Sequence, residues 1–124
     1  MAISEAEAIV MDVLWRDATP RSAEEILAEV GPRQGWQEGT VKSLLNRLLK
    51  KKAIKADRDG RRYLYTALLS REKYVSQESK GLLDRLFGGR VAPLVAHFSE
   101  QRKLSKKDLA ELRKLLKELD DEQP

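Results

Sequence analysis

Residues 38–68, EGTVKSLLNRLLKKKAIKADRDGRRYLYTAL, contain the strongest structural signal in the chain. In the first part of this stretch, a valine and several leucines recur at three- and four-residue spacing, the period of a helix with one buried face. In the second part, two short runs of alternating character flank Asp59-Gly60, a pair typical of hairpin turns because glycine accepts a positive φ. The stretch therefore predicts a helix over residues 38–52 and a two-stranded hairpin over residues 54–68.

The side chains of this helix that lie off the leucine stripe are small, amide or basic. Arginine can donate two hydrogen bonds to guanine and asparagine can pair with adenine, so Arg47 and Asn46 are the candidates for reading bases. Hydroxyl and ammonium groups on the same face suit contacts with phosphate. Any solvated helix face can carry such residues, so the interpretation also depends on their surroundings. The predicted DNA-contacting residues of the helix are Thr40, Lys42, Ser43, Asn46, Arg47, Lys50 and Lys51.

Basic residues are concentrated around this helix. Residues 37–70 carry nine basic and three acidic residues, whereas residues 1–36 carry three basic and seven acidic ones. A local positive potential of this kind favours an anionic partner such as nucleic acid. Three arginines, Arg58, Arg61 and Arg62, surround the hairpin turn, and they are predicted to contact phosphate or the minor groove.

Two shorter helices are predicted before residue 38, and each begins with a capping box, in which a serine and a glutamate satisfy each other's backbone amides. The first helix is expected to reach about Trp15. The second is expected to end at Gly31-Pro32, because proline lacks an amide hydrogen. Trp15 and Trp36 are expected to cover the core rather than to stack on bases. The capping pairs are Ser4 with Glu7 and Ser22 with Glu25.

Residues 70–124 are predicted to form a helical region, separate from a winged-helix domain at residues 1–69. Gly88-Gly89 interrupts the helical pattern, a short apolar helix is expected over residues 91–98, and a third helix begins at Ser105 with leucines at seam spacing. Two heptads are too few for an independent coiled coil, so the region is interpreted as a dimerisation surface. The residues assigned to this surface are Leu82, Leu86, Leu94, Phe98, Leu109, Leu112, Leu116 and Leu119.

The composition argues against several classes of protein. The chain has no cysteine and a single histidine, which leaves no thiolate site and little for a metal cluster or a Ser-His arrangement, so neither cofactor nor catalysis is expected. The apolar runs are far shorter than the roughly 18 residues of a membrane span. Glu5 and Glu7 precede any basic residue, unlike a secretory signal, so a cytoplasmic protein is expected.

With these residues placed, the chain resembles the penicillinase repressor and methicillin-resistance repressor family from Ile3 to about Leu119. The resemblance implies a mainly α (α+β) protein with an N-terminal winged helix-turn-helix, a two-stranded wing and a C-terminal helical dimerisation region. It also implies a homodimeric transcriptional repressor that binds a palindromic double-stranded DNA operator and controls genes for β-lactam resistance or copper handling. The likeness rests on residues 3–7, Val10, Met11, Val13, Leu14, Trp15, Trp36, Thr40, Val41, Leu44, Arg47, Leu48, Tyr63, Tyr65, Leu94, Val95, Phe98, Leu104, Ser105, Glu111 and Leu112.

The chain departs from the family pattern at three points. In the β-lactam branch a membrane sensor protease cuts an Asn-Phe bond, and the matching candidate proteolytic site here is His97-Phe98, which lacks the asparagine. The copper-sensing branch uses a cysteine cluster, and this chain has no cysteine. Gln37 stands where the family has a Ser or Thr cap, a change that costs about 1 kcal/mol.

Two other classes of function stay open at the level of the sequence. A protein-interaction adaptor could use the winged head and the leucine-rich tail only to bind other proteins. An enzyme fits less well, because the carboxylates lie at helix starts or on solvated faces, without a clustered base or metal site.

Overall fold

The computed structural model describes residues 2–122 of the chain. These residues divide into two compact units, one that reaches Val75 and one that begins at Ser76.

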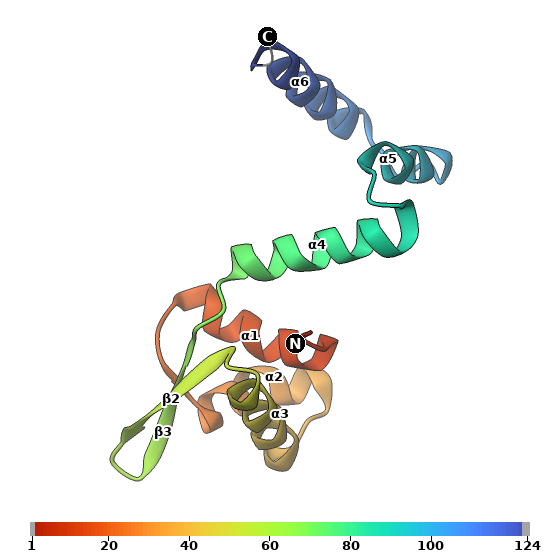
Figure 1. Cartoon of the computed structure of the whole chain (residues 1–124). Coiled ribbons are helices and arrows are strands. Elements are labelled where there is room, and N and C mark those ends of the chain that lie inside the picture. Colours follow the sequence, from red (N-terminus) through yellow and green to blue (C-terminus); the bar gives the residue numbers. More distant parts are fainter. Residues whose placement is uncertain (1, 123–124) are drawn as a thin grey trace. The chain divides into compact units, whose positions relative to one another are not determined.

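Three helices make up most of the first unit (Figure 1). α1 spans Glu5–Asp17, α2 spans Ala23–Gln34 and α3 spans Glu38–Lys50. Each helix turns one apolar face towards a shared core, as the three- and four-residue spacing of its apolar residues predicts. The buried core residues are Val10, Met11, Val13, Leu14, Ile26, Val30, Val41, Leu44, Leu45, Leu48, Ala53 and Ile54.

Capping boxes begin α1 and α2, which confirms the prediction. The Glu7 amide donates to Ser4 Oγ at 3.1 Å, and the Ser4 amide donates to Glu7 Oε1 at 2.9 Å. Ser22 and Glu25 repeat this arrangement at 3.2 and 3.0 Å. At the start of α3, by contrast, the Gln37 side chain makes no capping hydrogen bond. The first amides of α3 therefore lack an acceptor from the side chain of the cap residue.

α2 is longer than expected. The predicted end at Gly31-Pro32 is wrong, because the helix continues to Gln34 with Pro32 in its last turn. Proline fixes φ at about −65°, which suits a helix, but it has no amide to donate to the carbonyl four residues earlier. In the last turn this costs the helix one backbone hydrogen bond and does not interrupt the turns that follow, because the helix is about to end. The helix ends at Gly35, whose φ is 70° and whose amide donates to the Gly31 carbonyl.

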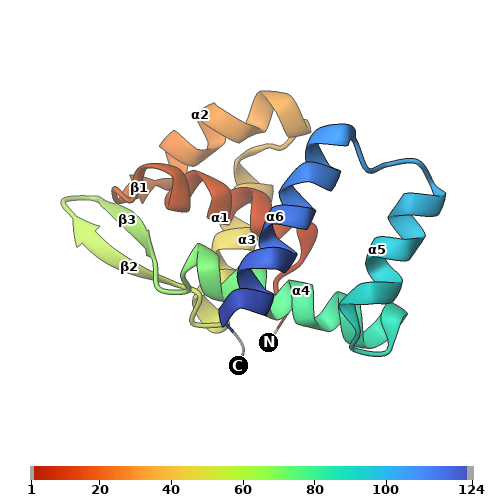
Figure 2. The ribbon, with the colours of Figure 1, turned by 90° about the horizontal axis from the view of Figure 1, so that it is seen from above.

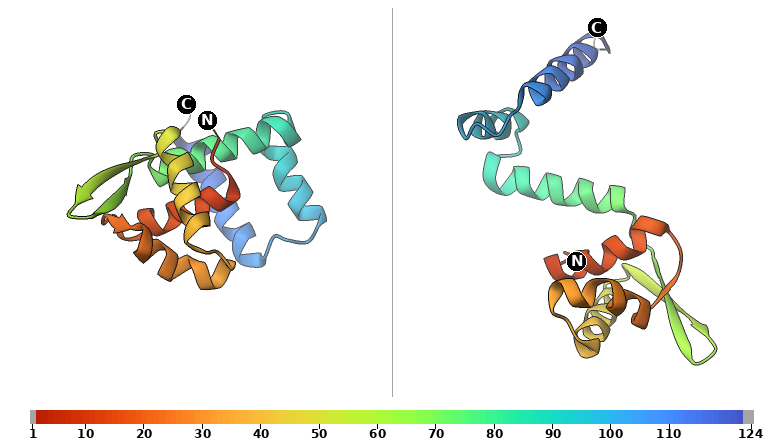
Figure 3. Two further views of the ribbon diagram at one scale, coloured as in Figure 1. Left: turned by 90° about the horizontal axis from the view of Figure 1, so that it is seen from below. Right: turned by 180° about the vertical axis from the view of Figure 1, so that it is seen from behind.

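A three-stranded antiparallel sheet completes the first unit, with strand order β1-β3-β2. β2 (Ile54–Asp59) and β3 (Arg62–Ala67) form the predicted hairpin. Gly60 has a φ of 65° at the first central position of the turn, a conformation that glycine adopts without strain. β1 (Arg21–Ser22) pairs with the middle of β3 and was not predicted, because two residues are too few to show alternation. The hairpin projects away from the three helices of this unit (Figure 2 and Figure 3).

The two tryptophans pack partly buried against the core, as predicted. The indole Nε1 of Trp15 donates a hydrogen bond to the Leu69 carbonyl at 2.8 Å. The Trp15 ring also lies 5.2 Å from the ring of Tyr74, measured between centroids. The end of α1 is thereby fixed to the chain that leaves β3, which holds the base of the hairpin in place.

Helices form the second unit. α4 (Arg71–Phe87) begins in the first unit and ends in the second, α5 spans Val91–Glu100 and α6 spans Lys106–Glu122. The predicted interruption at Gly88-Gly89 is confirmed, since α4 ends at Phe87. No described side chain of these three helices is buried. Exposed large apolar residues of the unit are Leu82, Leu86, Val91, Phe98, Leu109, Leu115, Leu116 and Leu119.

Among residues 2–122, no helix has both the length and the apolar character needed to cross a membrane.

Candidate nucleic-acid interface

α3 has two chemically distinct faces. Its buried residues Val41, Leu44, Leu45 and Leu48 belong to the predicted apolar stripe, and Leu49 is half-buried at the edge. Every predicted DNA-contacting residue within α3 is exposed, whereas Lys51 follows the helix. The core packing of one face thus presents the opposite face to solvent. The exposed set is Thr40, Lys42, Ser43, Asn46, Arg47 and Lys50.

Lys42 is paired within α3. Its Nζ lies 2.7 Å from Glu38 Oε1, one helical turn earlier. The hydrogen bond to Glu38 raises the pKa of Lys42, and the same contact lowers the pKa of Glu38. Both groups are therefore fully charged at neutral pH. A phosphate that approached Lys42 would have to compete with the carboxylate of Glu38.

A hollow of about 210 Å³ lies between the start of α2, the start of α3 and the hairpin. Lys42 lines it from α3, and Arg61 and Arg62 line it from the hairpin, so two elements predicted to contact DNA face the same space. Tyr63 and Tyr65 line it as well, although they were not assigned to the site from the sequence. Tyr63 and Tyr65 lie two residues apart on β3 and therefore on one face of the strand, which is the pattern in the sequence that could have placed them together. The other lining residues are Ser22, Ala23, Glu24 and Glu38.

The arginines at the hairpin turn are exposed, and two of them have contacts within the hairpin. The guanidinium carbon of Arg58 lies 6.0 Å from the centre of the Tyr63 ring, directly across the strand pair. Arg62 Nη2 lies 3.3 Å from Asp59 Oδ2. Exposed pairs of this kind hold a side chain only weakly. The hairpin therefore carries cationic groups that can be redirected towards an anion.

Lys51, which is predicted to contact DNA, is paired within the protein rather than free on the exposed face of α3. Its Nζ is 2.6 Å from Glu7 Oε1 and donates to the Ala2 carbonyl at 2.8 Å. Glu7 is 2% exposed and the Lys51 side chain is 20% exposed. Since its ammonium is already bound by Glu7 and by the Ala2 carbonyl, Lys51 is not among the proposed DNA contacts.

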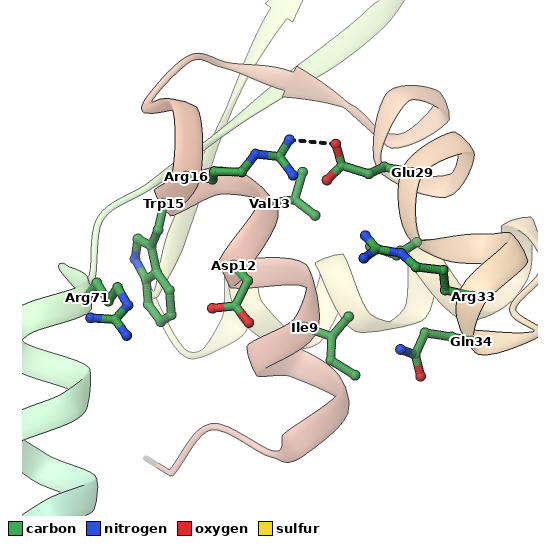
Figure 4. Close-up of a pocket in the computed structure, with 10 residues that line it drawn as sticks. Ile9, Asp12, Val13, Trp15, Arg16, Glu29, Arg33, Gln34 and Arg71 are labelled. Carbon is green, nitrogen blue, oxygen red and sulfur yellow. Dashed lines mark hydrogen bonds and ion pairs between the residues drawn. The ribbon is translucent and has the colours of Figure 1, made fainter. Parts of the chain in front are cut away.

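A second hollow, of about 520 Å³, lies between α1, α2 and the start of α4 (Figure 4). Arg16 spans it and donates to Glu29 at 2.5 Å, and this hydrogen bond lowers the pKa of Glu29. Arg33 and Arg71 add positive charge to the lining, and Asp12 adds negative charge. The charges in this hollow are mixed, and none of the predicted DNA-contacting residues lines it.

The residues predicted to form a dimer lie in the second unit, on α4, α5 and α6. Leu94 and Leu112 are half-buried and the others are exposed. His97-Phe98 lies inside α5, where the His97 ring contacts the rings of Phe87 and Phe98 at centroid distances of 6.0 and 5.4 Å. Within residues 2–122 no cluster of three or more His, Cys, Asp or Glu could hold a metal ion.

Three helices followed by a hairpin, with exposed basic residues on α3 beside that hairpin, define a winged-helix DNA-binding protein. The profile of the family described as penicillinase repressor matches residues 3–118, and the chain belongs to this family. The predicted fold class and the predicted class of function, a DNA-binding transcriptional repressor, are confirmed.

Individual relatives of the chain are named as repressors or regulators of antibiotic resistance. The penicillinase repressor of Bacillus licheniformis is 31% identical over 116 residues, which is 94% of this chain and 90% of that protein. The methicillin resistance regulatory protein MecI of Mammaliicoccus sciuri is 31% identical over 114 residues, 92% of each chain.

Solved structures agree with the first unit. The DNA-binding domain of the repressor BlaI is 32% identical, with a TM-score of 0.53, over 58% of this chain and 87% of that chain. Monomeric Bacillus licheniformis BlaI in complex with the blaP half-operator is 31% identical, with a TM-score of 0.52, over 60% of this chain and 89% of that chain.

Proposed function

We propose that this chain represses transcription as a homodimer that binds a palindromic operator, with α3 in the major groove and the hairpin on the DNA backbone. The observation that carries the proposal is the shared hollow lined by Lys42 of α3 and by Arg61 and Arg62 of the hairpin. One anionic surface can meet both elements at once. We propose genes for β-lactam resistance or related stress responses as targets, and sequencing of genomic fragments retained by the protein would identify them.

The contacts divide by chemistry. Arg47 and Asn46 read base edges, because their side chains can form paired hydrogen bonds with guanine and adenine. Of the other predicted contacts on α3, Thr40 and Ser43 contact phosphate or a thymine methyl group, and Lys42 and Lys50 contact phosphate. The hairpin arginines Arg58, Arg61 and Arg62 contact phosphates beside the groove.

The dimer forms through the second unit, within the proposed domain of residues 70–124. Exposed leucines and a phenylalanine along α4, α5 and α6 leave an apolar surface that a monomer would keep in water. A second copy of the chain would cover this surface and place two α3 helices on half-sites about 34–36 Å apart, or at a multiple of that distance.

The experiment that tests DNA binding is a salt titration on a duplex that contains the operator. With about six to ten phosphate contacts in the dimer, affinity falls by roughly 10³- to 10⁵-fold between 50 and 200 mM salt. Salt-insensitive binding contradicts the proposal. A stable dimer that shifts no duplex at low salt would instead favour the protein-interaction adaptor. We do not propose catalysis, because DNA binding accounts for the chemistry of the site without it. Turnover of a substrate that survives substitution of the α3 basic residues would support the hypothesis that the protein is an enzyme.

The dimer is tested by Leu116→Glu, with Lys117→Glu as a matched control on the adjacent residue of α6. Leu116 is 60% exposed, so the substitution leaves the fold of one chain intact while it places a charge on the apolar surface. Sedimentation should show a monomer for Leu116→Glu and a dimer for the control. If both variants were dimers, the dimer interface would have to lie on another surface than the one around Leu116.

Cleavage by a membrane sensor protease is a separate part of the proposal. The candidate bond, His97-Phe98, lies within α5, and a helix must unwind locally before a protease can cut it. His97→Asn restores the Asn-Phe pair of the β-lactam branch. Immunoblots of cells that contain the sensor protease, taken after exposure to a β-lactam, would compare the two proteins. If only the His97→Asn variant were cut, the original His97-Phe98 pair would be shown to resist the sensor protease.

A further inference from the structure

An ion pair between a buried carboxylate and a partly buried ammonium lies at the point where α3 ends and the hairpin begins. Glu7 of α1 is 2% exposed and accepts from Lys51 Nζ at 2.6 Å. The same ammonium donates to the Ala2 carbonyl at 2.8 Å. Forty-four residues separate the two partners, so the contact joins the start of the chain to the far end of α3.

The chain around Lys51 links α3 to the hairpin. Lys51 is the residue after the last turn of α3, and Lys52 then adopts a left-handed φ of 60°. Ala53 is buried, and its carbonyl accepts from the amides of Leu68 and Leu69 at 2.8 and 3.0 Å, which closes the base of the hairpin. A shift of Lys51 would therefore move both elements that meet the DNA.

Within the part of the chain that the structure describes, no comparable polar anchor holds the other end of α3. The Gln37 side chain makes no capping hydrogen bond to the first turn, and the Glu38–Lys42 pair lies on the exposed surface of the same helix. The apolar stripe holds α3 against the core, but apolar contacts are not directional and tolerate small slides. The contact between Lys51 and Glu7 is short, charged and directional.

Stability by itself is a poor explanation for the pair of Glu7 and Lys51, because removing the charges from water offsets much of their attraction. Among residues 2–122, the buried Oε2 of Glu7 has no hydrogen-bond partner, and an ion pair taken out of water often contributes no more than apolar residues of the same size. We propose that Glu7 and Lys51 are positioning residues, which set the placement of α3 and the hairpin and so determine how well the protein distinguishes its operator from other DNA. This inference rests on the proposed function.

The two roles open to Lys51 predict opposite effects for Glu7→Gln. If Lys51 contacts phosphate, Glu7 competes with DNA for the ammonium, and removal of the carboxylate tightens binding to every duplex. If Lys51 positions α3, the same substitution loosens the anchor and binding to the operator weakens. The glutamine side chain keeps an oxygen for the Ser4 amide, so the capping box of α1 is preserved.

The test compares Glu7→Gln, Lys51→Met and the double variant, with Lys52→Met as the matched control. Lys52 carries the same charge one residue further on, and its side chain is exposed. Dissociation constants are measured for the operator and for a scrambled duplex at several salt concentrations. The double variant leaves no buried charge without a partner, and its circular dichroism spectrum and melting temperature show whether it is folded.

We expect the ratio of operator to scrambled affinity to fall by about five- to tenfold in both single variants and in the double variant, which is the lower end of the loss for a whole bidentate base contact. The dependence on salt should not change, and Lys52→Met should alter both affinities by the same factor. A salt slope lowered by about one in Lys51→Met, with tighter binding by Glu7→Gln, would identify a phosphate contact and overturn the inference. Unchanged discrimination in the folded double variant would overturn it too. Failure of the original protein to bind the operator would instead refute the proposed function.

Discussion

Lys42 Nζ and Glu38 Oε1 lie 2.7 Å apart on the exposed face of α3. The carboxylate of Glu38 therefore competes with a DNA phosphate for the Lys42 ammonium. Removal of the carboxylate by Glu38→Gln should free Lys42 and remove a charge that repels DNA. We expect affinity for operator and scrambled duplexes to rise by a similar factor of a few fold, because phosphate contacts carry no sequence information. Fluorescence anisotropy measures both. Weaker binding would mean that Glu38 itself holds α3 in its bound position.

Arg47 and Arg61 should differ in what they contribute. Arg47→Ala removes a base-reading group, so we expect binding to the operator to weaken while binding to scrambled DNA changes little. Arg61→Ala removes a phosphate contact, so both duplexes should lose affinity equally and the salt slope should fall by about one. Competition binding at three salt concentrations separates the two outcomes. Equal effects of both variants on discrimination would contradict this division.

Gly60 and Gly39 should respond in opposite directions to alanine. A Cβ at either position meets no atom within 4 Å, so backbone conformation decides the outcome. Gly60 has a φ of 65°, and alanine there should destabilise the domain by about 1 kcal/mol. Gly39 lies in the first turn of α3, where alanine should stabilise by up to about 1 kcal/mol. Urea denaturation of the two variants measures both effects, and a stabilised Gly60→Ala would show that the turn relaxes freely.

The stability of the protein should fall in acid partly through Glu7. Burial pushes the pKa of Glu7 upwards, but hydrogen bonds from Lys51 and Ser4 outweigh it, so the pKa lies below its ordinary value of 4.5. A carboxyl with a lowered folded-state pKa stabilises the fold above its unfolded-state pKa and loses that contribution as pH falls through the folded-state value. The difference in unfolding free energy between the original protein and Glu7→Gln should therefore be larger at neutral pH than in acid below the ordinary pKa. Urea denaturation under both conditions measures it, and a difference independent of pH would contradict the assignment.

Features encoded within one turn of helix or one tight turn could be predicted from the sequence. The serine–glutamate pairs at Ser4 and Ser22 lie three residues apart, and the leucine stripe of α3 repeats within thirteen residues. The turn at Gly60 follows from two adjacent residues. Local spacing fixes each of these features, so the order of elements and the exposed face of α3 could be derived before the fold was known.

Features that depend on distant residues could not be predicted. The partner of Lys51 lies on α1, and nothing in the run of lysines at residues 50–52 distinguishes Lys51 from its neighbours. β1 exists only because Arg21 and Ser22 meet β3 across the fold. The end of α2 was misplaced because Pro32 disfavours a helix in general, whereas its position in the last turn makes the loss small.

The strand order leaves β2 with one free edge along the hairpin. An unpaired strand edge is a template on which other chains can assemble, and natural sheets guard against this with charged side chains. β2 reads IKADRD, in which Lys55, Asp57, Arg58 and Asp59 leave no run of apolar residues to match a partner strand. Arg58, which we propose as a DNA contact, thus acts together with Lys55 and the two aspartates to keep copies of the free protein from assembling through their hairpins. Uncharged replacements in β2 would therefore raise the risk of fibre formation even where DNA binding survived.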